Sequence, residues 1–231
     1  MIKFKKAFTM VELIMVIVVI AILAAMSIPR LKRDTRIEAI NHVLMAIRYA
    51  QNTALHDDKH SNTSTLWERS FWRFGISRCS DGGLFYYIGS SQRLQRSLTN
   101  NEYLIDPANG KNIGYASGNP CSKSSVIVDK NITSDNIFLS SNYGISNVVA
   151  TPTYVSTQDG NDFYNIFLVG FDNLGRTMDA NFPNNNWPNH LFYITSDINL
   201  TFSFQDSSIA PFTIIIPKET GYAYLAENPK L

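Results

Sequence analysis

The chain has 231 residues, a formal net charge of +1 and an aromatic content of 12%. The near-neutral balance argues against nucleic acid as the main partner, because phosphate contacts need a basic surplus. The aromatic content, with Asn, Ser and Thr crowded into the second half, excludes a disordered chain and predicts a β-rich domain with polar turns.

A short Lys-rich leader, residues 1–7, precedes an apolar run from Phe8 to Ile28. The polar residues in this run are Thr9, Glu12 and Ser27. As a helix the run would be about 31 Å long, which is the thickness of the hydrocarbon core of a bilayer. Its Phe, Leu, Ile and Val residues favour insertion by about 4–7 kcal/mol, whereas one carboxylate costs at most about 3.5 kcal/mol. The run therefore predicts a membrane helix that tolerates Glu12.

Two roles for Glu12 are compatible with the sequence. "TMVE", residues 9–12, has the form of a capping box, in which Thr9 and Glu12 satisfy each other's main-chain amides at a helix start. If the mature chain began at Phe8, the new α-amine would lie one helical turn from Glu12. In a bundle, each Glu12 could then neutralise the amine of a neighbouring chain inside lipid.

The position of the leader distinguishes it from an ordinary secretory signal, which is cut after its apolar stretch. Here "MIKFKKA" is followed at once by "FTMVE" and an apolar helix that ends at Pro29. This order resembles the class III signal of type IV pilins and pseudopilins. The resemblance implies cleavage between Ala7 and Phe8 by prepilin peptidase and N-methylation of Phe8. It also implies subunit registration by Glu12 and a helix kink at Pro29.

The same resemblance implies a location and a set of partners. The helix of residues 8–28 would anchor the chain in the bacterial inner membrane as a single pass and later form filament core, with the C-terminal head in the periplasm. Other pilins or pseudopilins and an inner-membrane assembly platform would be its partners. One departure from the family is Ala7, because the residue before the cut is usually Gly.

Helical spacing continues past Pro29 and predicts an amphipathic extension over residues 29–57, which makes one helix of about 70 Å ending near His56. The apolar stripe consists of Ile37, Ile40, Leu44, Ile47 and Ala54. The opposite side carries Arg36, Glu38, Asn41, Arg48 and Asn52. We expect the stripe to pack under the globular domain. A coiled coil is the weaker alternative, because the pattern spans fewer than four heptads.

The rest of the chain, residues 66–231, predicts a β-rich globular head with an antiparallel two-sheet arrangement, and hence an α+β fold. Strands are expected at 71–78, 84–89, 125–129, 136–140, 163–171, 191–195, 198–204, 212–217 and 221–226. In residues 198–204 apolar and polar residues alternate, as in a sheet with one wet face. Residues 212–217 are apolar almost throughout and predict a central strand buried on both faces.

Four stretches resemble the H-type minor pseudopilins and the related T-like minor pilins. They are "AIRYAQNTAL" (46–55), "LWERSFWRFGI" (66–76), "FDNLGR" (171–176) and "IPKETGY" (216–222). Their order along the chain agrees with that group. The middle of the head, about residues 90–160, has no counterpart there and is interpreted as an expansion.

No motif for catalysis or for a cofactor is found, so we expect a protein that is not an enzyme. "HDDKH" (56–60) offers two imidazoles and two carboxylates, but a solvated helix end is the favoured interpretation because no further ligands are visible. Calcium at Asp159, Asn161 and Asp162 is disfavoured, because "DGND" lacks the order of a calcium loop. A polar turn is the favoured interpretation there.

Two kinds of modification are predicted for the exported head. Cys79 and Cys121 have no zinc-like spacing, and a disulfide between them is favoured over two separate buried thiols. Asn131 and Asn199 each lie in an N-x-T sequence with Asp two residues earlier, which resembles the acid-extended sequon of certain bacterial oligosaccharyltransferases. Chance occurrence is the alternative in a chain so rich in Asn, Ser and Thr.

Together these features predict a minor pseudopilin, a structural subunit of a type II secretion or type IV pilus-like machine. Such a machine serves protein secretion, pilus assembly or DNA uptake in competence, and direct nucleic-acid binding by this head is disfavoured. The alternative from another class is a membrane-tethered periplasmic binding module or enzyme that does not polymerise.

Overall fold

The computed structural model describes residues 9–59, 67–79, 82–92, 98–115, 131–152, 157–158, 163–180 and 193–226. For residues 24–34 it describes the helical backbone alone.

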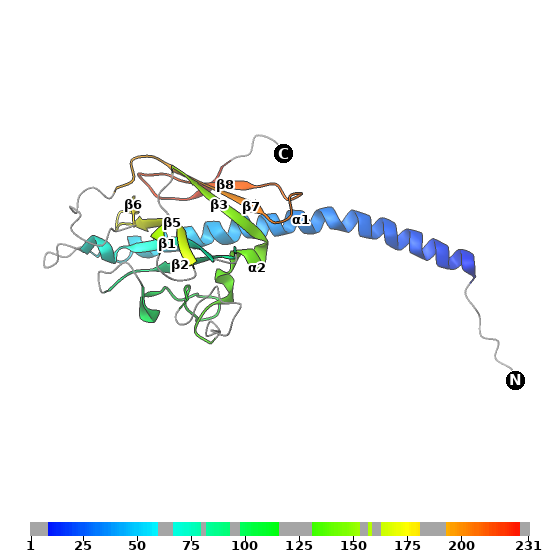
Figure 1. Ribbon diagram of the computed structural model, residues 1–231, viewed down its shortest axis with the longest axis horizontal. Coiled ribbons are helices and arrows are strands. Elements are labelled where there is room, and N and C mark those ends of the chain that lie inside the picture. Colours follow the sequence, from blue (N-terminus) through cyan, green and yellow to red (C-terminus); the bar gives the residue numbers. More distant parts are fainter. Residues whose placement is uncertain are drawn as a thin grey trace.

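Helix α1, Met10–Leu55, comprises 46 residues and is about 69 Å long at 1.5 Å per residue. It begins at the N-cap Thr9 with the predicted capping box and ends at the C-cap His56. The helix continues through Pro29 without interruption. Its first half projects from the head, whereas its second half lies lengthwise along it (Figure 1).

Two antiparallel sheets form the head, as the sequence predicts. The first has the order β2-β1-β5-β4, with β6 also paired to β5: β1 (Trp72–Cys79), β2 (Leu84–Gly89), β4 (Thr157–Gln158), β5 (Phe163–Phe171) and β6 (Thr177–Asp179). The second has the order β3-β7-β8-β9: β3 (Ile145–Thr151), β7 (Ile198–Phe204), β8 (Phe212–Ile216) and β9 (Tyr224–Leu225). Short helices complete the described part: η1 (Trp67–Ser70), η2 (Asn100–Glu102), η3 (Asp135–Ile137) and α2 (Leu139–Tyr143). The fold is therefore α+β.

One face of the first sheet packs on α1. Ile76 of β1 is paired with Tyr86 of β2 and Phe167 of β5, so the three side chains lie on the same face. Phe74, two residues earlier, is fully buried and stacks on Tyr86 at 5.7 Å between ring centroids. The Tyr86 hydroxyl in turn reaches His42 of α1. One hydrophobic core joins the helix to both sheets.

Residues 98–115 and 131–138, called the covering segment here, protect the outer edge of β2. The amide of Ile88 donates to Ile113 O, and the amide of Leu104 donates to Ile88 O, each at 2.9 Å. Tyr103 and Tyr87 meet edge to face, with 6.3 Å between ring centroids. An open strand edge invites pairing with other chains, and the covering segment removes that edge. The expansion expected around residues 90–160 thus contains this segment and strand β3.

Two strand predictions differ from the structure. Residues 136–140 form the end of η3 and the start of α2 instead of a strand, because the Ser134 side chain caps η3 and Gly144, with φ +67°, ends α2. Of residues 191–195, Tyr193 makes an isolated bridge to Met178, and residues 191–192 lie outside the described part. The strand predicted at 125–129 also lies outside it. Strands β3, β4 and β6 were not predicted.

The two clearest strand predictions had different outcomes. In β7 the residues Ile198, Leu200, Phe202 and Phe204 are all buried, as their alternation predicts. The expectation that 212–217 is buried on both faces is wrong. In β8, Thr213 and Ile215 are only half-buried, because α1 and the first sheet cover one face of the second sheet alone.

The buried face of α1 is also shifted from the predicted stripe. The buried residues are Ala39, Ile40, Val43, Ala46, Ile47, Ala50, Gln51 and Ala54. Ile37, predicted to be in the stripe, is 42% exposed. Arg36 and Arg48, predicted to face away from the head, bond to it. The sheets approach α1 over its alanines, whose small side chains permit close packing. The predicted stripe was based mainly on large apolar residues, so it missed most of these alanines.

Candidate functional site: the N-terminal helix and its attachment to the head

The first turn of α1 holds the carboxylate of Glu12 in a fixed geometry. Thr9 donates to Glu12 Oε2 twice, from its main-chain amide at 2.8 Å and from its hydroxyl at 2.9 Å. The amide of Glu12 donates back to Thr9 Oγ1 at 3.2 Å. The capping role predicted for Glu12 is thus present, and it supplies acceptors for amides that have no partner inside the helix.

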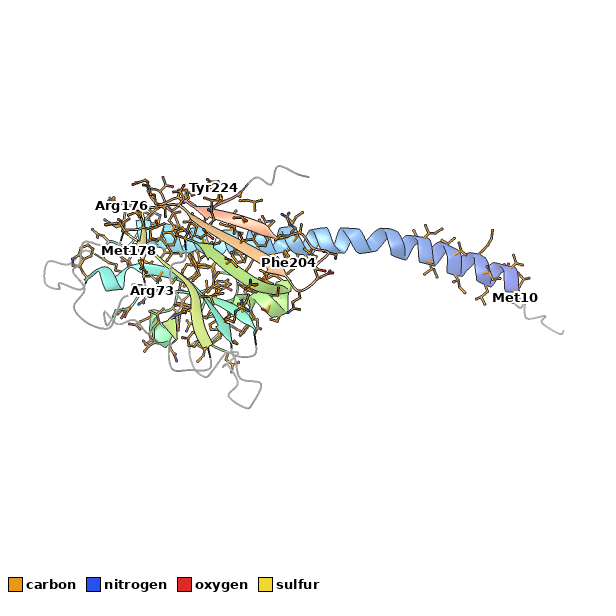
Figure 2. The ribbon with its side chains drawn as sticks, turned by 45° about the horizontal axis from the view of Figure 1, so that its top comes forward. Met10, Arg73, Arg176, Met178, Phe204 and Tyr224 are labelled. Carbon is orange, nitrogen blue, oxygen red and sulfur yellow. The ribbon has the colours of Figure 1, made fainter. Side chains whose placement is uncertain are left out.

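An apolar surface without a cover within the described chain follows this turn. Twelve large apolar residues between Met10 and Leu23 are exposed, with fractions from 48% for Val16 to 80% for Met10. Their side chains project around the whole helix (Figure 2). Soluble monomers rarely expose apolar patches larger than a few hundred Å², so this surface requires lipid or apolar protein to cover it.

Polar side chains on the second half of α1 fasten it to loops of the second sheet. Arg36 donates to Ala210 O at 2.9 Å and to Pro211 O at 3.3 Å, both in the β7–β8 loop. Arg48 donates to Ala223 O at 2.9 Å and lies 4.3 Å above the Tyr222 ring. These contacts hold the loops before β8 and β9 against the helix.

Gln51 joins two further turns that the sequence analysis singled out. Its Nε2 donates to Gly175 O at 3.4 Å and to Thr220 O, so "FDNLGR" and "IPKETGY" meet at one side chain of α1. Gly221 has φ +61°, and a Cβ there would lie 2.2 Å from Gly175 O. A side chain at position 221 would therefore push the two turns apart.

Asp172 organises the first of these turns. The carboxylate is fully buried and accepts from the amides of Leu174 at 3.0 Å and Arg176 at 2.8 Å. Its other oxygen accepts from Arg176 Nε at 2.8 Å and from the Tyr193 hydroxyl at 3.0 Å. Four donors compensate the burial of this charge, so the turn that Gln51 contacts has a defined shape.

The structure places the remaining predicted site residues as follows. Asn131 and Asn199 are exposed, the first in a turn and the second within β7. Cys79, at the end of β1, is disulfide-bonded; Cys121 lies outside the described residues, so the pairing stays a prediction. Ala7, Phe8, His60, Asp159, Asn161 and Asp162 also lie outside them. The described residues contain no group of three or more His, Cys, Asp or Glu that could hold a metal ion.

The acidic end of α1 has a structural contact that the sequence did not reveal. Asp57 accepts from the indole Nε1 of Trp72 at 2.8 Å and pairs with Lys59 at 2.6 Å. It therefore joins the helix end to the first strand. Such partners are brought together by the fold, and no spacing in the sequence signals them. The contacts of Gln51 have a partial signal in the two Gly-containing turn motifs.

Comparison with known proteins identifies the class of the N-terminal region. The family model of the prokaryotic N-terminal methylation motif matches residues 2–28, which confirms the class III prepilin leader of type IV pilin-like proteins. No curated protein and no solved structure gives a significant match.

The N-terminal region accordingly carries the leader of type IV pilin-like proteins, which supports a pilin-like or pseudopilin subunit. Its leader implies processing by prepilin peptidase and assembly with other pilin-like subunits, and it fits a membrane-anchored pilin. Within the part of the chain that the structure describes, no helix has the length and apolar character needed to cross a membrane.

Proposed function

We propose that the chain is a minor pseudopilin, a structural subunit without catalytic activity in a type II secretion or type IV pilus-like machine. The helix of residues 8–28 anchors the precursor in the inner membrane and later joins the filament core, and the head stands in the periplasm. The machine serves protein secretion, pilus assembly or DNA uptake.

The observation that carries this proposal is the contrast along α1. The part from Met10 to Leu23, which lies within the matched motif, exposes apolar side chains all around, whereas the part from Ala39 to Ala54 is bound into a folded head. An apolar helix that is rigidly continuous with a soluble head can pass from lipid into a bundle of like helices without refolding. The resemblance of four head segments to H-type and T-like minor subunits supports the minor role.

Within this proposal Glu12 acts as the assembly contact. A carboxylate offers about four acceptor positions, and the two bonds from Thr9 both go to Oε2. Capping is therefore compatible with an ion pair to the Phe8 amine of a neighbouring subunit. In an apolar surrounding, that pair would align two helices with little tolerance for a shift along their axes.

The decisive experiment separates the charge of Glu12 from its capping role. Glu12→Gln keeps a capping-box residue but removes the charge, and Thr9→Ala removes the cap but keeps the carboxylate. We expect Glu12→Gln to be cleaved normally and to lose crosslinking to partner subunits and complementation of a deletion strain. Thr9→Ala should retain both.

The opposite result has an equally clear meaning. If Glu12→Gln crosslinks to partner subunits and complements like the wild type, Glu12 is only a helix cap. If the wild type itself does not crosslink to partner subunits, a tethered periplasmic binding module or enzyme becomes the better description. Loss of assembly in Thr9→Ala with retention in Glu12→Gln would likewise assign the site to capping.

A further inference from the structure

His42 of α1 is half-buried where the helix meets the head. Its Nε2 is 3.0 Å from the main-chain oxygen of Asn136 and 3.0 Å from the Tyr86 hydroxyl. The imidazole also lies against the Tyr143 ring, with 4.8 Å between centroids and 30° between planes. One side chain of the helix thus contacts β2, α2 and the covering segment.

The hydrogen bonds define the tautomer. A carbonyl oxygen only accepts, so Nε2 carries the hydrogen that reaches Asn136 O, and in the neutral ring Nδ1 holds a lone pair. The bond to Asn136 is the direct polar link between His42 and the covering segment.

Asn136 also forms a hydrogen bond with the buried carboxylate of Asp106. Its Nδ2 donates to Asp106 Oδ2 at 2.9 Å, and the Ser134 hydroxyl donates to the same oxygen at 2.6 Å. Burial opposes ionisation of Asp106, but hydrogen bonds from Ser134, Ala108 and Asn136 hold its pKa below the ordinary value. Asp106 is therefore ionised throughout the range in which a histidine titrates.

The groups around the imidazole act on its pKa in opposite directions. Burial lowers the pKa of His42, and this effect outweighs the Asn136 carbonyl and the Asp106 carboxylate, which both favour the protonated ring. Burial also raises the pKa of Tyr86 and of Tyr143. The carboxylate of Glu38, which precedes His42 by one turn on α1, contributes to the rise for Tyr143. Both phenols stay neutral, so neither supplies a negative charge to an imidazolium.

We propose that docking of the covering segment on α1 is pH-dependent and that His42 is the group that senses pH. The docked arrangement favours the neutral ring. Its stability is therefore complete above the ordinary histidine pKa of about 6.5 and declines as the pH falls through that value toward the lower pKa of the folded state. Each unit by which the folded pKa is lowered corresponds to about a tenfold loss in the docking equilibrium. This inference does not depend on the proposed function.

Amide hydrogen exchange of the full chain in detergent tests the proposal between pH 7.5 and pH 5. We expect the protection of residues 131–143, corrected for intrinsic exchange, to fall as the pH decreases. His42→Gln keeps a donor for Asn136 O and cannot titrate, so its protection should be independent of pH. His56→Gln removes an exposed histidine at the end of the same helix and should retain the wild-type decline.

Direct titration of the wild-type imidazoles by NMR keeps the test valid even if His42→Gln folds poorly. A His42 pKa below the ordinary histidine value of about 6.5 supports the proposal. A His42 pKa at or above that value overturns it, as does an equal decline of protection in the wild type and in a folded His42→Gln variant.

Discussion

The two halves of α1 belong to one uninterrupted helix, yet they meet different surroundings. From Met10 to Leu23 the helix carries large apolar side chains that are exposed on all sides. From Ala39 to Ala54 its buried face consists of four alanines, two isoleucines, Val43 and Gln51, with Ala39 at its start. The comparison teaches that apolar content alone does not decide what a helix contacts within its own chain. Small side chains let the sheets approach, whereas the bulky side chains of the first half are exposed within the described part of the chain.

The same substitution, isoleucine to alanine, should affect the free energy of unfolding very differently in the two halves of α1. Ile47 is fully buried and Ile17 is 57% exposed. Ile47→Ala removes packed methyl groups and should lower the free energy of unfolding of the head by about 2–5 kcal/mol. Ile17→Ala should change it by less than about 0.5 kcal/mol. Urea unfolding of the full chain in detergent measures both, and similar losses would show that the two halves are equally buried.

A comparable effect is expected where the packed half of α1 holds the two glycine turns. Gly221→Ala should cost about 2–5 kcal/mol, because a left-handed conformation costs about 1–2 kcal/mol and overpacking adds about 1–3 kcal/mol. Gly110 is the matched control, since its φ is +72° and a Cβ there meets nothing within 4 Å. Gly110→Ala should therefore cost only the conformational part. Thermal unfolding compares them, and equal losses would refute a close approach of the turns.

A substitution in the leader should have the smallest effect on the fold, because the leader precedes the exposed half of α1 and not the half that packs on the head. Ala7→Gly restores the residue usual before the cleavage site and should increase the rate of processing, with no change in the unfolding of the head. Pulse–chase labelling measures the rate, and mass spectrometry of the mature protein should show methylated Phe8. An intact Met1 start, or cleavage toward the end of the apolar run as in an ordinary secretory signal, would contradict the assignment of the leader.

Sequence reasoning succeeded where a short stretch contains its own explanation. The capping box needs only Thr9 and Glu12, three residues apart, and it is present. The alternation in β7 needs only the period of a strand, and the predicted residues are buried. It failed at 136–140, where the consecutive apolar residues 137–139 span the end of a 3₁₀-helix and the start of a short α-helix, because Ser134 and Gly144 set the local backbone.

The candidate site shows the same division. The methylation motif is local and could be recognised from residues 2–28 alone, and the exposed apolar half of α1 follows from its composition. The residues that attach the helix to the head were misplaced. Arg36 and Arg48 looked like a solvated face, because their acceptors are carbonyl groups more than 170 residues away along the chain.

The sequence by itself determined the leader, the long capped helix and the β-rich head with one clean amphipathic strand. These features depend on interactions within a few residues, whose periods and spacings can be read directly. The buried face of α1 became clear only from the tertiary structure. The same is true of the contacts of Gln51 with two distant turns and of His42 with β2, α2 and the covering segment. These contacts depend on side-chain size and on main-chain carbonyl groups, which every residue carries. No sequence pattern therefore predicts which residues form them.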